Sequence, residues 1–401
     1  MNKRIGIINI DRAKFYLLYL FMFLIFLIPP ASEKLISSDV YGFIKISSYF
    51  LIIIYVILNL KKINFSILLM IGFNLILVLS TFINKGEITE SIKHAVTVLI
   101  ICLILADVID NNIKKISFIY VIRDLTLIFF VINLLMIKLY PTGIPSLTYD
   151  PKFPNFLYGN VNSTIKHILP GMCCSSLIDF RTNKKVSFKT LIFIFGIFYQ
   201  AIFVYFTATA VINCLFILGW IYIFCFSNKY NIRNVYLISI TLIFIIEIML
   251  VSRLKSVSLI SNMLGKDFTF SGRIYLWDNV MNLITKKIFI GYGVMDDSLV
   301  VFLIGNFYGS HNYFLDLLFQ RGIIGLIFLI IIMIYPLLTK VDLKNDKYIN
   351  LLFGYSVSCF ILFLTEPIYN KEYLILPIIF SLIYSIEKSD NISLKGLNSE
   401  K

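Results

Sequence analysis

One histidine and two glycines in the C-terminal half of the chain have a spacing that could serve chemistry. His311-Asn312 is followed after nine residues by Gly322, and two residues later by Gly325. His311 comes after the polar Gly309-Ser310 and directly before an apolar run, so it is expected at the outer end of a membrane helix. A helix N-terminus favours neutral imidazole, which can accept a proton. His311 is therefore a candidate general base, with a helix-capping or interfacial histidine as the alternative.

The composition around this segment is typical of a multi-pass membrane protein. Of 401 residues, 59% are hydrophobic and only 15% are charged, and the mean hydropathy is +0.86. A soluble domain could not bury that much apolar surface. The formal net charge is +13, but the lysines and arginines lie mainly in short segments between apolar runs. This pattern indicates membrane topology, and no nucleic-acid partner is expected.

Neither the cysteines nor the histidines have the spacing of metal ligands. All six cysteines lie inside apolar stretches, and three histidines are present without a His-x-x-x-His pattern. The cysteines are interpreted as core residues. We predict no metal site and no cofactor.

The apolar runs predict about twelve membrane helices, because roughly 20 mostly apolar residues are needed to cross a bilayer. They lie near residues 15–31, 40–60, 66–84, 88–109, 117–140, 162–180, 188–206, 209–227, 235–252, 312–338, 348–365 and 373–387. The seventh and eighth divide at Thr207-Ala208-Thr209-Ala210, inside an apolar run too long for one helix. We predict an all-α polytopic membrane protein in which residues 1–401 form a single membrane domain.

The basic residues of the connections predict the orientation. Alternate connections carry the following positive groups: Lys61-Lys62, Lys114-Lys115, Arg181 with Lys184 and Lys185, Lys229 with Arg233, and Lys340 with Lys344 and Lys347. Positive connections face the cytoplasm, so both termini are placed inside. Residues 253–311 then form a long extracytoplasmic loop between helices 9 and 10.

A helical repeat of apolar residues lies within this loop. Ile274, Trp277, Met281 and Ile284 recur at intervals of three and four residues. They predict an amphipathic helix that lies on the outer membrane surface.

Ionisable side chains inside the predicted helices are expected to have a structural or functional role, because inserting each one near the bilayer centre costs about 2.5–3.5 kcal/mol on insertion scales. Arg123 and Asp124 are adjacent and point to different faces of one helix. We therefore expect separate partners on other helices for these two side chains.

The spacing at His311 resembles that of a known family. His311-Asn312, nine residues, and Gly322-Ile323-Ile324-Gly325 are similar to the signature shared by bacterial O-antigen ligases and Wzy-type O-antigen and capsule polymerases. Ser271-Gly272-Arg273 with Trp277, followed by Gly291-Tyr292-Gly293, resembles the Arg, Trp and Gly-x-Gly segment that precedes the signature in that family. The resemblance covers roughly residues 155–330.

One further motif matches the family and one is missing. Gly159-Asn160-Val161-Asn162-Ser163 resembles the asparagine-bearing start of a middle span. The family often carries Ser-Arg where this chain has Thr207-Ala208-Thr209-Ala210, so one cationic contact is absent or comes from elsewhere. Arg253, Lys255 and Arg321 are the candidates for that contact.

The resemblance implies a GT-C-like membrane glycosyltransferase with a polyprenyl-pyrophosphate-linked oligosaccharide as donor. It implies catalytic roles for His311, as the base that activates the acceptor hydroxyl, and for Arg273, because arginine can grip phosphate oxygens through two parallel hydrogen bonds. The implied substrate-binding residues are Asn312, Trp277, Asn162, Arg253, Lys255 and Arg321. The implied partners are the lipid-linked donor and acceptor, membrane lipids and a chain-length regulator. The implied location is the cytoplasmic (inner) membrane.

Three readings of the function stay open beside the one we favour. The favoured function is polymerisation of oligosaccharide repeat units into O-antigen or capsular polysaccharide. An O-antigen ligase would use the same donor but a lipid-core acceptor. A lipid-linked oligosaccharide flippase would be expected to show internal repeats and short outer loops, and a membrane scaffold would leave the spacing at His311 to chance.

Overall fold

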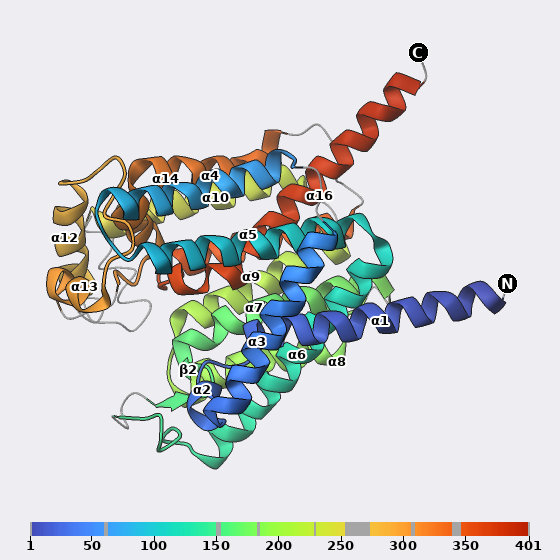
Figure 1. The fold of residues 1–401 in the computed structure, drawn as a ribbon, viewed down its shortest axis with the longest axis horizontal. Helices are drawn as coiled ribbons and strands as arrows, with labels where there is room; N and C mark the ends of the chain where they lie inside the picture. The colour runs from blue at the N-terminus through green and yellow to red at the C-terminus, as the bar shows by residue number, and fades with distance from the viewer. Residues whose placement is uncertain are drawn as a thin grey trace. The chain divides into compact units, whose positions relative to one another are not determined.

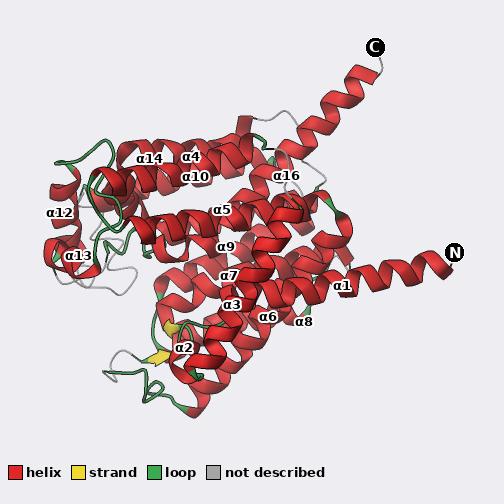
Figure 2. Cartoon of the chain, in the orientation of Figure 1, coloured by secondary structure: helices red, strands yellow, loops and turns green. Residues whose placement is uncertain are grey.

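The structure is a computed structural model, and it describes the chain except for residues 1, 60–62, 150–153, 183–184, 228–229, 253–272, 306–308, 339–345 and 400–401. The described chain is almost entirely helical (Figures 1 and 2). The extended elements that it contains are β1 (Asn155–Phe156) and β2 (Gly159–Asn160), which pair as a short antiparallel hairpin. The all-α polytopic class predicted from the sequence is confirmed.

The helices fall into two compact units. The first unit comprises residues 1–62, 103–230 and 343–355, and the second comprises residues 63–102, 231–342 and 356–401. Because α5 and α15 begin in one unit and end in the other, the boundary falls inside two helices.

Nine helical elements make up the described part of the first unit, counting the portions of α5 and α15 that belong to it. They are α1 (Asn2–Leu27), α2 (Ser32–Leu35), α3 (Ser38–Leu58), the second half of α5 (Ile88–Asp110), α6 (Asn112–Leu139), α7 (Val161–Thr182), α8 (Phe188–Tyr199) with the π-helical turn η1 (Gln200–Val204), α9 (Ala208–Ile221) with the π-helical turn η2 (Tyr222–Ser227), and the first half of α15 (Lys347–Phe363). Within this unit α6 packs against both α1 and α7.

The second unit holds the segment around His311. Its elements are α4 (Phe65–Ile83), the first half of α5, α10 (Ile232–Val251), α12 (Arg273–Ile284), α13 (Asp297–Ile304), α14 (Tyr313–Leu338), the second half of α15, the 3-10 turn η3 (Tyr369–Lys371) and α16 (Glu372–Ser399). Helix α14 packs against α4, α10, α12 and α16. It is the element around which this unit is arranged.

Each apolar segment predicted from the sequence coincides with a helix. Within the described residues, seven helices are long and apolar enough to cross a membrane, and two further apolar helices, Phe188–Val204 and Lys347–Phe363, are shorter. The total of twelve spans stays a prediction. The break between the seventh and eighth segments lies at residues 205–207, where the chain leaves the π-helical turn before α9 begins.

One expectation about buried charges was wrong. Arg123 Nη2 lies 2.7 Å from Asp124 Oδ1, so the two neighbours do form an ion pair. The arginine side chain is long enough to bend around the helix to the adjacent carboxylate. Asp124 also accepts hydrogen bonds from Tyr16 and Lys189 of other helices, both at 3.2 Å.

Candidate functional site

The three residues from Ser310 to Asn312 form a tightly bonded turn that leads into α14. The Ser310 N–H donates to Asp316 Oδ1 at 2.7 Å, and the Ser310 hydroxyl donates to the Asn312 carbonyl at 2.5 Å. Ser310 Oγ also accepts from the Asn312 N–H at 3.1 Å. Both Ser310 and Asn312 are fully buried. The turn is therefore anchored on either side of His311.

His311 has a backbone conformation that is unusual for a residue with a side chain. Its φ is 54°, in the left-handed region, and among the described non-glycine residues only Lys85 shares a positive φ. This region disfavours most L-residues, although Asn, Asp and His occupy it more often than others. His311 is half-buried, in contrast to its buried neighbours. The bonded turn thus sets the direction in which the imidazole leaves the backbone.

Asn312 serves as an anchor for the same turn. Its side-chain oxygen accepts from the Leu315 N–H at 3.1 Å, which satisfies one of the unpaired donors at the start of α14. Its amide nitrogen donates to the two carboxylate oxygens of Glu247 on α10, at 3.0 and 2.8 Å. The turn before α14 is therefore tied to a second helix through buried side-chain hydrogen bonds.

Helix α12 is attached to the turn through Trp277. The indole nitrogen donates to the Ser310 carbonyl at 2.9 Å, and the ring is buried. Arg273 lies four residues before Trp277 and thus on the same side of α12. The hydrogen bond of Trp277 therefore holds the helix that carries Arg273 against the residue preceding His311.

Arg273 itself retains unused hydrogen-bonding capacity. Its Nη1 donates to the Thr365 carbonyl at 3.0 Å, and within the described chain this is its only hydrogen bond. The side chain is half-buried. Burial lowers the pKa of Arg273 and the nearby Glu366 carboxylate opposes that shift, yet a guanidinium stays protonated in proteins. Arg273 can offer its remaining donors to an anion.

The apolar face of α12 packs on protein. Leu276, Trp277, Val280 and Ile284 form a buried cluster with Leu315 and Phe319 of α14 and with neighbouring apolar residues. The expected helix at residues 274–284 is present. Its position on the outer membrane surface stays a prediction.

Gly322 of the motif lies at a backbone junction between α14 and residues 288–293. At Gly322 the helix α14 breaks, with φ 61° and ψ −165°. A Cβ at Gly322 would lie 2.2 Å from the Phe289 carbonyl oxygen, so only glycine fits there. The break leaves backbone groups of α14 unpaired, and residues 288–293 pair with them. The bonds run from Tyr292 N–H to Phe319 O (2.7 Å), Gly293 N–H to Gln320 O (2.9 Å), Ile323 N–H to Ile288 O (2.8 Å) and Ile324 N–H to Phe289 O (3.3 Å).

Arg321 is committed to a buried carboxylate. Its two terminal nitrogens donate to the two oxygens of Glu372 at 2.7 and 2.8 Å. Glu372 also accepts from the Tyr313 hydroxyl at 2.6 Å and lies 2.8 Å from His94 Nε2. Arg321, Glu372 and Tyr313 are fully buried. These four side chains link α5, α14 and α16.

The structure brings some of the predicted site residues together. His311, Asn312, Trp277 and Arg273 are connected through the Ser310 turn and α12. Asn162 lies in the first unit, half-buried in the first turn of α7. Arg253 and Lys255 lie outside the described residues, as do Ser271 and Gly272. Arg321 is in the same unit as His311, but its terminal donors are occupied by Glu372.

Sequence reasoning missed two residues that organise this region. Glu372 stands at the start of the last predicted span, where a charged residue is typical of a membrane boundary. Its role as the partner of the buried Arg321 is visible only in the structure. Ser310 is a small polar residue with no distinguishing pattern beyond its position before His311. Within the described residues, no group of three or more His, Cys, Asp or Glu side chains is placed to hold a metal ion.

The comparison with known families fits this geometry. Residues 191–330 match the family model described as O-Antigen ligase. This stretch is a little over a third of the chain and includes α12, the Ser310 turn and the break in α14. The resemblance to the O-antigen polymerase and ligase family is thereby confirmed over these residues. No curated protein and no solved structure matches the chain.

Proposed function

We propose that this protein polymerises polyprenyl-pyrophosphate-linked oligosaccharide repeat units at the outer face of the cytoplasmic membrane, with His311 as the general base. The family match and the apolar helices support a membrane enzyme of polysaccharide synthesis, of the ligase or polymerase kind.

The observation that carries the proposal is the conformation of His311. A left-handed backbone at a residue other than glycine persists only where the surroundings hold it, and such strained positions cluster at functional sites. Ser310 and Asn312 supply that hold through buried hydrogen bonds. A histidine that only capped α14 would not be needed, because Asn312 already performs the capping.

The proposed step transfers a glycan from a pyrophosphate to a hydroxyl. An acceptor oxygen attacks the anomeric carbon of the donor, and the bond from that carbon to the pyrophosphate oxygen breaks. The hydroxyl proton passes to His311, and the leaving polyprenyl pyrophosphate keeps the bonding electron pair. A positioned base typically contributes about 10²- to 10⁴-fold to such a step. The imidazolium then loses its proton to water.

Arg273 is the better of the two arginines for the leaving pyrophosphate. Among the described residues its terminal nitrogens donate to one carbonyl, whereas both terminal nitrogens of Arg321 donate to the buried carboxylate of Glu372. Moving Arg321 to a substrate would strand a buried carboxylate, which costs several kcal/mol. We therefore assign the pyrophosphate contact to Arg273 and a structural role to Arg321.

A ligase is the second candidate, and the description of the matching family favours it. Polymerase and ligase share the donor and differ in the acceptor, which is another repeat unit in one case and a finished lipid core in the other. We favour the polymerase because the chain lacks the Ser-Arg element at residues 207–210. Divergence is expected of polymerases, since each reads a different repeat unit.

Deleting the gene and analysing the surface glycan distinguishes a polymerase from a ligase. Loss of a polymerase leaves single repeat units that are still transferred to their final carrier. Loss of a ligase leaves long chains on the polyprenyl carrier and none on the surface acceptor. The second outcome would overturn the polymerase assignment, and a normal surface glycan would overturn both.

A further inference from the structure

A cavity of about 350 Å³ lies in the first unit, apart from the residues discussed above. It is bounded by α1, the start of α6, the end of α7 and the start of α15. Its volume falls within the range of about 300–1,000 Å³ that small-molecule sites occupy. Four of the described residues that line it are cations, namely Arg12, Lys115, Arg181 and Lys347, and none of the described lining residues is acidic.

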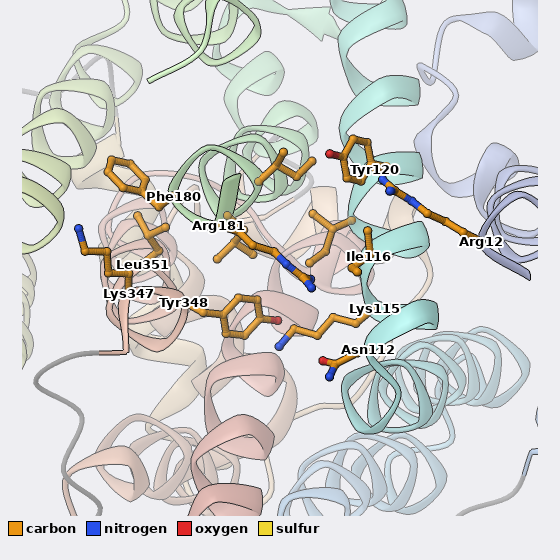
Figure 3. Close-up of a pocket in the computed structure, with 13 residues that line it drawn as sticks. Arg12, Asn112, Lys115, Ile116, Tyr120, Phe180, Arg181, Lys347, Tyr348 and Leu351 are labelled. Atoms are coloured by element: carbon orange, nitrogen blue, oxygen red, sulfur yellow. The ribbon is translucent and has the colours of Figure 1, made fainter. Parts of the chain in front are cut away.

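The polar groups of the cavity point toward one another. Figure 3 shows Arg181 and Lys115 extending into the same space, with the Tyr348 hydroxyl and the Asn112 amide beside them. Arg12 reaches toward this space from the opposite side, along Tyr120. Lys347 points away and donates to the Cys225 carbonyl at 2.7 Å. Arg181 and Lys115 are therefore the principal cations.

Aromatic rings position these cations. Lys115 Nζ lies 3.5 Å from the centre of the Tyr348 ring, and the Arg12 guanidinium lies 4.5 Å from that of Tyr120. A ring face holds a cation without cancelling its charge. Neither Arg12 nor Arg181 forms an ion pair with a described carboxylate. With four basic residues and no acidic residue in its described lining, the cavity favours an anion.

The rest of the lining is aliphatic. Ile116, Ile119, Leu177, Ile178 and Leu351 complete the wall. A soluble phosphate gains nothing from such a wall, whereas a phospholipid matches both parts, with its phosphate on the cations and its glycerol and acyl carbons on the aliphatic side chains. Basic pockets between membrane helices are a known setting for anionic head groups.

We propose that this basic pocket, formed by Arg12, Lys115, Arg181 and Tyr348, binds the phosphate group of an anionic membrane lipid. The ends of α6, α7 and α15 that meet here are those whose basic connections the sequence places on the cytoplasmic side. The lipid therefore comes from the inner leaflet. The pocket is independent of the glycosyl-transfer step and of the residues proposed for it.

The test uses the full-length protein, purified in a neutral detergent and stripped of lipid. Its thermal unfolding midpoint is measured with increasing phosphatidylglycerol, with phosphatidylcholine of the same acyl chains, and with inorganic pyrophosphate. A ligand that binds only the folded protein raises the midpoint. We expect phosphatidylglycerol to raise it and the other two to have little effect.

Variants locate the site. Arg181→Gln should raise the phosphatidylglycerol concentration for half-maximal stabilisation by about tenfold, the effect of losing one charge-assisted contact, and adding Lys115→Gln should remove most of the shift. Arg181 is exposed, so its replacement leaves folding intact. Lys185→Gln, an exposed cation of the same connection outside the pocket, is the matched control and should behave as wild type.

Two results would overturn the proposal. Equal stabilisation of wild type and the double variant by phosphatidylglycerol would remove the pocket as the site. Stabilisation by pyrophosphate as large as that by phosphatidylglycerol, and lost in the double variant, would assign the pocket to a soluble phosphate. Neither result depends on glycan synthesis, so neither bears on the proposed enzyme activity.

Discussion

Arg321 and Glu372 form a two-pronged ion pair in which neither side chain is exposed to solvent. The pair lies beside the break in α14, since Arg321 directly precedes Gly322. Phe73 of α4 covers it, with the guanidinium carbon 4.3 Å from the centre of the ring. The pair holds the first turns of α14 in place, and the Ser310 turn directly precedes them.

Removing one partner should destabilise the protein. Arg321→Met or Glu372→Gln leaves a buried polar group uncompensated, which typically costs about 3–5 kcal/mol. We expect a marked fall in the thermal unfolding midpoint of either single variant in detergent. The combination Arg321→Met with Glu372→Gln should recover part of that loss. A stable Arg321→Met protein that binds donor poorly would instead assign Arg321 to the substrate.

The two tryptophans of the chain provide a matched pair of variants. Trp277 donates to the Ser310 carbonyl at 2.9 Å, and Trp220 in the first unit donates to the Asn350 carbonyl at 2.8 Å. Replacing either by Phe removes one buried hydrogen bond and should cost about 1–3 kcal/mol of stability. Only Trp277→Phe should lower the rate of glycan transfer beyond what its stability explains. Equal transfer rates for the two variants would show that the position of α12 does not affect glycan transfer.

His311→Asn should abolish polymer formation while the protein still folds and inserts. Asparagine tolerates the left-handed backbone, so the variant removes the base and keeps the turn. The expected loss of rate is about 10²- to 10⁴-fold, measured as glycan chain formation from purified donor.

Lys85 is the control for the backbone effect. It has the same φ of 54° but an exposed side chain outside the site. Lys85→Ala exchanges one residue with a Cβ for another at this φ, so both stability and activity should stay near those of the wild type, whereas His311→Ala should lose activity. Wild-type activity of His311→Asn would exclude the proposed base.

Arg273→Lys should be nearly as harmful to transfer as Arg273→Ala. Lysine keeps the charge but cannot make the planar two-pronged contact with phosphate oxygens. Because Arg273 makes a single hydrogen bond within the described chain, neither variant should change the unfolding midpoint greatly. Arg321→Lys should behave differently and lower the unfolding midpoint, because it weakens the buried ion pair with Glu372. Full activity of Arg273→Lys would show that charge alone is required.

The orientation can be tested with two single cysteines. Lys286→Cys and Lys185→Cys place exposed thiols on connections that the sequence assigns to opposite sides, and the six native cysteines are all buried. An impermeant thiol reagent should label residue 286 in intact cells and residue 185 only after the membrane is opened. The reverse labelling would place the proposed site in the cytoplasm.

The helices could be predicted because hydrophobicity is a local property that one sequence displays. The break near Thr207 could be anticipated for the same reason, since an apolar run of that length exceeds one span. The pairing of Arg123 with Asp124 could not, because helical geometry alone gives the direction of Cβ and not where a long side chain ends.

The candidate site could be predicted only where its residues belong to a motif that one sequence displays. His311 and Arg273 could be named as candidates from their motifs, and their roles stay predictions. The role of Glu372 could not be named, because it depends on Arg321 lying opposite it, 51 positions earlier in the chain. Gly322 was visible as a motif, but its reason, the approach of the Phe289 carbonyl, is a contact between distant segments.

The junction at Gly322 joins residues 288–293 to α14 through four main-chain hydrogen bonds. Main-chain bonds are indifferent to the identity of most side chains on the two segments. Residues around the junction other than its glycines can therefore change while the backbone frame that precedes and follows the break is kept. For an enzyme of the proposed kind, such a frame would allow the specificity for the sugar to change without a change of fold.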